Sequence, residues 1–113
     1  MKGFAFVSDA AEREYMDLPK DVLAEFGTSL RAVQEDKKPF LPIKSLNDIG
    51  AGLIELKING SPAYRCVYIA KFMNTVFVLH SFVKTTNGVD RQAMKTAKAR
   101  MKELKGELKK LAK

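Results

Sequence analysis

Residues 53–82 read LIELKINGSPAYRCVYIAKFMNTVFVLHSF, and this stretch decides the fold. It holds three segments rich in β-branched and aromatic residues, which favour strands. Two short connections, Asn59-Gly60-Ser61-Pro62 and Phe72-Met73-Asn74, separate the segments. Both suit antiparallel hairpins, because Asn and Gly accept the positive φ angles of tight turns. The stretch therefore predicts three strands in an antiparallel meander, over residues 53–58, 64–69 and 75–82.

Two helices are predicted before the meander. Residues 3–7 form a short apolar strand, after which Ser8 or Asp9 can cap a helix that begins near Ala10. Pro19 suits the first turn of a second helix, which the prolines of residues 39–42 bring to an end.

A third helix is predicted after the meander. Beyond Asp90, apolar residues recur every three or four positions with lysines on a neighbouring face, which indicates a basic amphipathic helix capped by Asp90 or Asn87. The order β-α-α-β-β-β-α predicts an α+β fold in a single domain, residues 1–113. Its antiparallel sheet carries two N-terminal helices and a C-terminal basic helix.

The net charge of +7 lies entirely at the C-terminal end of the chain. Residues 1–83 contain 10 Lys+Arg and 10 Asp+Glu, whereas residues 84–113 contain 10 and 3. Such asymmetry favours a polyanionic partner, because each phosphate that a cation neutralises releases condensed counterions. A nucleic acid or the ribosome would fit, and a merely solvated helix surface is the alternative.

The composition excludes several classes of protein. Because Cys66 is the only cysteine and His80 the only histidine, neither an internal disulfide nor a thiolate zinc cluster can form. We expect Cys66 to be a buried apolar filler and the protein to need no metal and no cofactor. Gly50-Ala51-Gly52 lacks the residues of a nucleotide phosphate loop. With no apolar run of membrane-spanning length and no visible secretory signal, the cytoplasm is the expected location.

Basic and aromatic residues follow the predicted sheet and indicate an anion-binding face. Alternation along the strands places Arg65 on the face opposite Tyr64, and it places His80, Phe82 and Lys84 together on one face. Simpler interpretations stay open at this point. Arg65 can pair with Glu55 on an adjacent strand, His80 can be a hydrogen-bonded structural residue, and Phe82 can belong to the core.

Four segments resemble the phage-derived HigB branch of the RelE/ParE toxin superfamily. They are GLIELK (52–57), YRCVY (64–68), VLHSFVKTT (78–86) and AKAR (97–100). Tyr-Arg at the start of one strand and Leu-His-Ser-Phe-Val-Lys in the next form the specific combination. The resemblance covers about residues 46–104. The chain departs from the family at Thr85, where a second lysine is common, and at residues 87–90, where a Thr-Pro entry to the last helix is common.

The resemblance implies a RelE-like toxin of a toxin–antitoxin system. Such toxins cut mRNA on the ribosome, inhibit translation and are held in check by a cognate helix-turn-helix antitoxin. The superfamily reaction is attack by a ribose 2′-OH on the adjacent phosphate without a metal. In that reaction Arg65 would hold the phosphate, His80 would transfer a proton, and Lys84 would stabilise charge or act as the base. The implied RNA-binding residues are Lys57, Lys71, Phe82, Lys98 and Lys102.

Two other classes of function remain open from the sequence. A ParE-like member of the same fold would inhibit DNA gyrase by binding, without cutting RNA. A non-catalytic nucleic-acid-binding module would use the basic helix and leave the sheet inert. The presence of Arg65, His80 and Lys84 together favours the ribonuclease.

Overall fold

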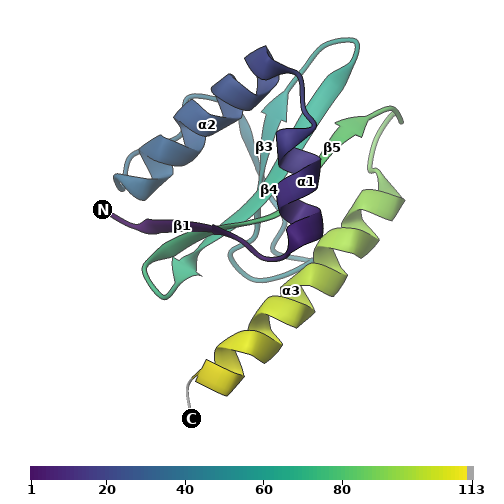
Figure 1. Cartoon of the computed structure of the whole chain (residues 1–113). Helices are drawn as coiled ribbons and strands as arrows, with labels where there is room; N and C mark the ends of the chain where they lie inside the picture. Colours follow the sequence, from purple (N-terminus) through teal and green to yellow (C-terminus); the bar gives the residue numbers. More distant parts are fainter. Residues whose placement is uncertain (112–113) are drawn as a thin grey trace.

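The computed structural model describes residues 1–111, which form one five-stranded sheet with helices on both faces (Figure 1). The strands lie in the order β1-β5-β4-β3-β2. The α+β class, the antiparallel β3-β4-β5 meander and the three helices are confirmed. The elements are β1 (Gly3–Phe6), α1 (Asp9–Met16), α2 (Lys20–Gln34), β2 (Ile43–Ser45), β3 (Ile54–Ile58), β4 (Ala63–Phe72), β5 (Thr75–Lys84) and α3 (Arg91–Leu111).

The sheet differs from the prediction in two ways. An additional strand, β2, pairs antiparallel with β3, and its Lys44 lies opposite Glu55. Three residues after a proline-rich stretch are too few to show alternation, so the sequence did not reveal this strand. The sheet is also mixed rather than antiparallel, because β1 pairs parallel with β5 while the other strands pair antiparallel as predicted. The chain can return in this direction because α1 and α2 lie between β1 and the meander.

Side-chain caps at the start of two helices and a tight turn between two strands lie where the sequence predicted them. The Ser8 hydroxyl accepts a hydrogen bond from the Ala11 amide at 3.1 Å, so α1 begins at Asp9. The Asp90 carboxylate caps α3 by accepting from the Ala93 amide at 3.0 Å. Between β4 and β5, Met73 and Asn74 both take positive φ angles, the combination that a tight hairpin turn requires.

Two apolar clusters hold the helices to opposite faces of the sheet. On one face α1 and α2 pack around Phe26 and Cys66, both of which are fully buried. On the other face α3 packs through Ala97 and Met101. Burial raises the pKa of the Cys66 thiol to about 12, which agrees with the predicted role as an apolar filler. Among residues 1–111, no helix combines the length and the apolar character that crossing a membrane requires.

A one-residue bulge in β5 determines which side chains face α3. Val67 lies opposite His80, but its neighbour Tyr68 lies opposite Val78, so Leu79 has no partner of its own. The extra residue shifts the alternation of β5 by one position. As a result His80, Phe82 and Lys84 lie on the same face as Arg65, the face that α3 partly covers.

Candidate active site

A small charged depression lies on this face, between the ends of the central strands and the start of α3. Its floor contains Glu55, Arg65 and Phe82, and its rim contains lysines from three strands together with residues 88–90. The cavity volume is about 60 Å³, the space of roughly two water molecules. The depression is therefore of a size for a small anion such as a phosphate group, but not for a whole nucleotide.

Arg65 forms the fixed positive charge at the floor. It pairs with Lys57 on β3 and with Phe82 on β5, and only 5% of its surface is exposed. Its Nη1 donates to the carbonyls of Ile58 and Tyr64, and its Nη2 donates to the Asn59 side chain. Its Nε lies 3.7 Å from a Glu55 oxygen and has no hydrogen-bond partner within residues 1–111. This N–H is buried and faces the Glu55 carboxylate.

Glu55 is a buried carboxylate surrounded by cations. It is 6% exposed and lies opposite Lys44 on β2 and Val67 on β4. Burial raises the pKa of Glu55, and the nearby Arg65 and lysines only partly oppose this. The Arg65–Glu55 ion pair, which the sequence analysis left open as a simpler interpretation of Arg65, is present, with 3.7 Å between Nε and the carboxylate oxygen. A carboxylate whose pKa is raised is a better proton acceptor than an ordinary glutamate.

The rim of the depression is made of lysines. Lys44, Lys57 and Lys84 come from β2, β3 and β5 and meet over the floor. Lys84 also borders a second hollow of about 600 Å³, which is lined by residues 60–63 and 85–87. An anion held by Lys84 can therefore belong to a longer chain that continues into this hollow.

His80 lies one layer behind the depression. Its ring stacks on Phe82 with the ring centres 4.8 Å apart, but it does not line the cavity itself. Its Nδ1 lies 2.8 Å from Glu14 Oε1, and Arg100 donates two hydrogen bonds to the same carboxylate, at 2.6 and 2.8 Å. Burial by itself raises the pKa of Glu14, but the hydrogen bonds from Arg100 and His80 outweigh it and lower the pKa. The structural interpretation of His80 as a hydrogen-bonded residue is therefore confirmed.

Comparison of the sequence with models of known protein families shows to which family this chain belongs. The family described as "Phage derived protein Gp49-like" matches residues 13–102, about four-fifths of the chain. The chain belongs to this Gp49-like family. The family is part of the RelE/HigB-like toxins of toxin–antitoxin systems, and membership implies a toxin with an antitoxin partner. A comparison with curated proteins found no match.

The family match includes the whole depression and the residues behind it. It extends beyond the segments that carried the resemblance, and it takes in Glu14 on α1 as well as Arg100 on α3. The Gp49-like region thus contains both ends of the hydrogen-bonded cluster at His80.

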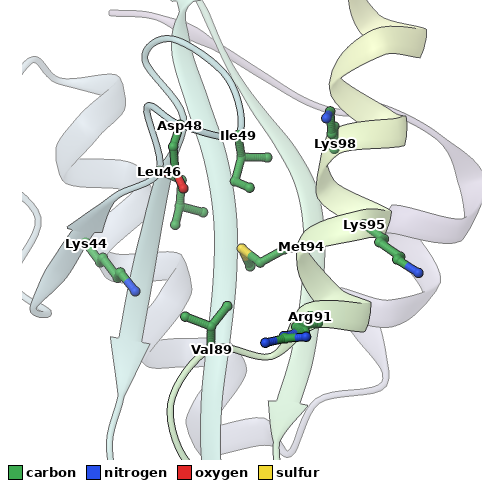
Figure 2. Close-up of a pocket in the computed structure, with 9 residues that line it drawn as sticks. All are labelled: Lys44, Leu46, Asp48, Ile49, Val89, Arg91, Met94, Lys95 and Lys98. Atoms are coloured by element: carbon green, nitrogen blue, oxygen red, sulfur yellow. The ribbon is translucent and has the colours of Figure 1, made fainter.

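The remaining predicted RNA-binding lysines lie away from the depression. Lys71 is exposed near the end of β4, with its ammonium 5.2 Å from the centre of the Phe72 ring. Lys98 and Lys102 are exposed on α3 and line a groove between that helix and the loop that contains Ile49. Figure 2 shows Lys98 on α3, where it also lines a neighbouring pocket at the N-terminal end of that helix. Their assignment to RNA stays a prediction.

Two functional candidates in the depression escaped the sequence analysis. Glu55 was considered only as a partner of Arg65, because it alternates with Lys57 on the polar face of its strand and its burial is seen only in the structure. Lys44 belongs to the strand that was missed. Glu14 lies 66 positions from His80 in the chain, and no local pattern indicates that contact.

Proposed function

We propose that this Gp49-like toxin is a metal-independent endoribonuclease of the HigB branch that cuts mRNA on the ribosome. The proposal rests mainly on one observation, the buried Glu55–Arg65 pair beneath three lysines. In-line attack by a ribose 2′-OH needs a proton acceptor beside fixed positive charge, and the pair supplies both. Translation would then stop in the cytoplasm, where ribosomes and mRNA meet.

Each side chain has a role that follows from its position. Glu55 accepts the proton of the 2′-OH while that oxygen bonds to phosphorus. The positive charges of the Arg65 guanidinium and the Lys84 ammonium stabilise the charge that develops on the phosphate oxygens. Phe82 offers its ring for base stacking, and Lys57 holds the RNA backbone.

A proton must also reach the leaving 5′ oxygen as its bond to phosphorus breaks. His80 is the candidate donor, because Glu14 holds its Nδ1 and leaves Nε2 for proton transfer. Since His80 stacks behind Phe82 and does not line the depression, the RNA would have to extend past Phe82 for the leaving oxygen to reach it. The products are a 2′,3′-cyclic phosphate and a free 5′-OH. No step requires a metal, and within residues 1–111 no three side chains of the metal-binding types lie together.

The decisive experiment is to express the chain without a partner and map RNA ends on ribosome-bound messages. We expect growth arrest with new 5′ ends inside coding regions, and no new ends from a Lys84→Met variant, because Lys84 is a partly exposed rim residue that should not be needed for folding. Intact mRNA together with trapped DNA gyrase would instead support the ParE-like function. Intact mRNA with unaffected gyrase but retained RNA binding would support a non-catalytic module.

A further inference from the structure

A short loop, residues 85–90, joins β5 to α3 beside the depression (Figure 1). It contains the dipeptide Asn87-Gly88, and residues 87–90 are one place where the chain departs from the toxins that it resembles. Both residues of the dipeptide are exposed. Within residues 1–111 neither the Asn87 side chain nor the Gly88 amide has a hydrogen-bond partner. A Cβ added at Gly88 would meet nothing within 4 Å, so no neighbouring atoms confine the dipeptide.

A second Asn-Gly dipeptide in the same chain provides an internal comparison. Asn59 and Gly60 lie in the turn between β3 and β4 and are also exposed. The Asn59 side-chain oxygen, however, accepts a hydrogen bond from Nη2 of the buried Arg65 at 3.3 Å. This bond fixes the orientation of the Asn59 side chain, whereas the Asn87 side chain is free to rotate toward the next backbone nitrogen.

We infer that Asn87-Gly88 is a site of spontaneous deamidation whose product weakens anion binding at the depression. Asparagine before glycine can cyclise, because glycine has no side chain to shield its nitrogen. The Gly88 nitrogen bonds to Cγ of Asn87, the bond from Cγ to the side-chain nitrogen breaks, and ammonia leaves with the proton of the Gly88 amide. Water then opens the five-membered succinimide at either carbonyl, which gives aspartate or isoaspartate. Water is the only co-reactant.

The position of the dipeptide connects this reaction with the candidate active site. Asn87 lines the hollow of about 600 Å³ that shares Lys84 with the depression, and Gly88 lines the depression itself. A carboxylate at position 87 opposes the positive charge of Lys84 and repels phosphate. Isoaspartate also inserts a methylene into the backbone just before α3. The loss of cleavage that follows rests on the proposed function, whereas the modification itself does not.

The modification is tested by ageing the purified full chain at mildly alkaline pH and digesting it with trypsin. Trypsin cuts after lysine and arginine, so residues 58–65 carry Asn59 in one peptide and residues 85–91 carry Asn87 in another. Deamidation raises a peptide's mass by about one unit and separates aspartate from isoaspartate forms on a column. We expect the peptide with Asn87 to react about fivefold faster or more in the folded chain, and the two to react alike in urea, where the Arg65 hydrogen bond is lost. Equal rates in the folded chain, or a slower reaction at Asn87, would overturn the inference.

The effect on anion binding is tested with a variant that carries the product's charge. The probe is a short 2′-O-methyl RNA, which cannot supply the attacking 2′-OH. Asn87→Asp should weaken its binding about three- to tenfold at low salt and less at high salt. Asn74→Asp, the same change in the turn between β4 and β5, is the matched control and should bind as the natural chain does.

Ageing should reproduce the effect of the variant. The aged natural chain should approach the affinity of Asn87→Asp, whereas aged Asn87→Gln should keep its own starting affinity, because the longer side chain does not form the five-membered ring. Unchanged RNA binding in both Asn87→Asp and the deamidated natural chain would overturn the effect on anion binding.

Cleavage assays separate this inference from the proposed function. If the fresh chain cuts mRNA and the deamidated chain cuts it equally fast, the inference fails while the ribonuclease stands. If Asn87 deamidates and RNA binding weakens, but the fresh chain does not cut RNA, the modification site stands while the ribonuclease fails.

Discussion

At the scale of single residues, the depression depends on two buried opposite charges that hold each other in place. Removing one partner of such a pair is costly, because the other charge stays buried without compensation. Arg65 also supports the turn after β3 through the Ile58 carbonyl and the Asn59 side chain. Tests of its chemical role should therefore keep the charge.

Arg65→Lys should lower the single-turnover rate of cleavage by about 10²-fold at saturating ribosome concentration. Lysine keeps the charge but lacks the planar fork that binds the carbonyls of Ile58 and Tyr64 and fixes the positive charge beside Glu55. The control is Lys102→Met on α3, which should weaken binding in a salt-dependent way and leave the saturated rate unchanged. A slow rate at saturation for Lys102→Met and a normal one for Arg65→Lys would remove the active site from the sheet.

Glu55→Gln should lower the cleavage rate by about 10²- to 10⁴-fold and abolish the acidic limb of the pH profile. In the natural chain the pKa of Glu55 is raised, so the ionised, base-competent form should be lost at a higher pH than an ordinary glutamate would give. The rate should thus fall with decreasing pH through a midpoint above 4.5, the usual value for the side chain. Glu103→Gln on the exposed side of α3 is the matched control, with an unchanged profile. An acidic limb that survives in Glu55→Gln would exclude Glu55 as the base.

At the scale of elements, the sequence predicted the helices and strands that follow a periodic residue pattern and missed the features that have no such pattern. The meander and α3 follow from alternation and from apolar spacing, and the caps at Ser8 and Asp90 follow from residue type. The bulge at Leu79 has no such pattern, because a bulge is defined by the pairing of two strands. The shared face of His80, Phe82 and Lys84 was predicted correctly, since alternation holds beyond the bulge.

The dependence on periodic patterns also explains which residues of the candidate site the sequence did not reveal. Arg65, Lys84 and Phe82 could be identified because they lie in strands with clear alternation, and their meeting in one depression is seen in the structure. The cluster of Glu14, His80 and Arg100 joins α1, β5 and α3 across the fold. Contacts at such separation depend on packing and leave no periodic trace in the chain.

Glu14→Gln should destabilise the fold by about 1–3 kcal/mol at neutral pH, because it weakens the charged hydrogen bonds that hold α3 to α1 and β5. The pKa of Glu14 is lowered in the folded state, so its contribution is present above the ordinary glutamate pKa and is lost as the pH falls through the lowered value. The difference in unfolding free energy between the natural chain and the variant should shrink below about pH 4. Denaturant titrations at several pH values measure it. Glu12→Gln, exposed on the same helix, should show no difference at any pH.

Gly106→Ala should stabilise the protein by roughly 0.5–1 kcal/mol. Gly106 lies inside α3, where glycine costs more backbone entropy than alanine, and nothing lies within 4 Å of an added Cβ. Gly50→Ala is the contrasting variant, because its Cβ would lie 3.1 Å from Met101 Cγ and push against a buried side chain of α3. Melting temperatures should move in opposite directions. A destabilised Gly106→Ala would show that α3 is not a regular helix at that point.

At the scale of the whole molecule, the net positive charge of α3 and the candidate active site lie on the same side of the sheet. The segment with the net charge forms α3, and α3 borders both the depression and the groove. The other face is filled by α1 and α2 around an apolar cluster. A polyanion attracted to α3 would therefore arrive next to the candidate active site, which should speed association at low salt.

Cleavage should survive chelation of divalent ions. The proposed reaction uses only protein groups, and within the part of the chain that the structure describes no three potential metal ligands cluster. A short RNA substrate cut without ribosomes is the appropriate assay, since ribosomes themselves need magnesium. Activity that EDTA abolishes and that one divalent ion restores would contradict a metal-independent mechanism.

The bulge in β5 determines the parity of this strand, because Leu79 is a residue that the pairing with β4 does not count. If Leu79 stayed in place and the strand paired regularly with β4, the residues before it would turn to the opposite face relative to those after it. Either Phe82 and Lys84 would leave the depression for the α1–α2 layer, or Val76 and Val78 would leave that layer for α3. Loss of the Leu79 codon would instead remove the bulge and keep Val78 and His80 on opposite faces, so this is a position where β5 can lose a residue without exchanging its two faces.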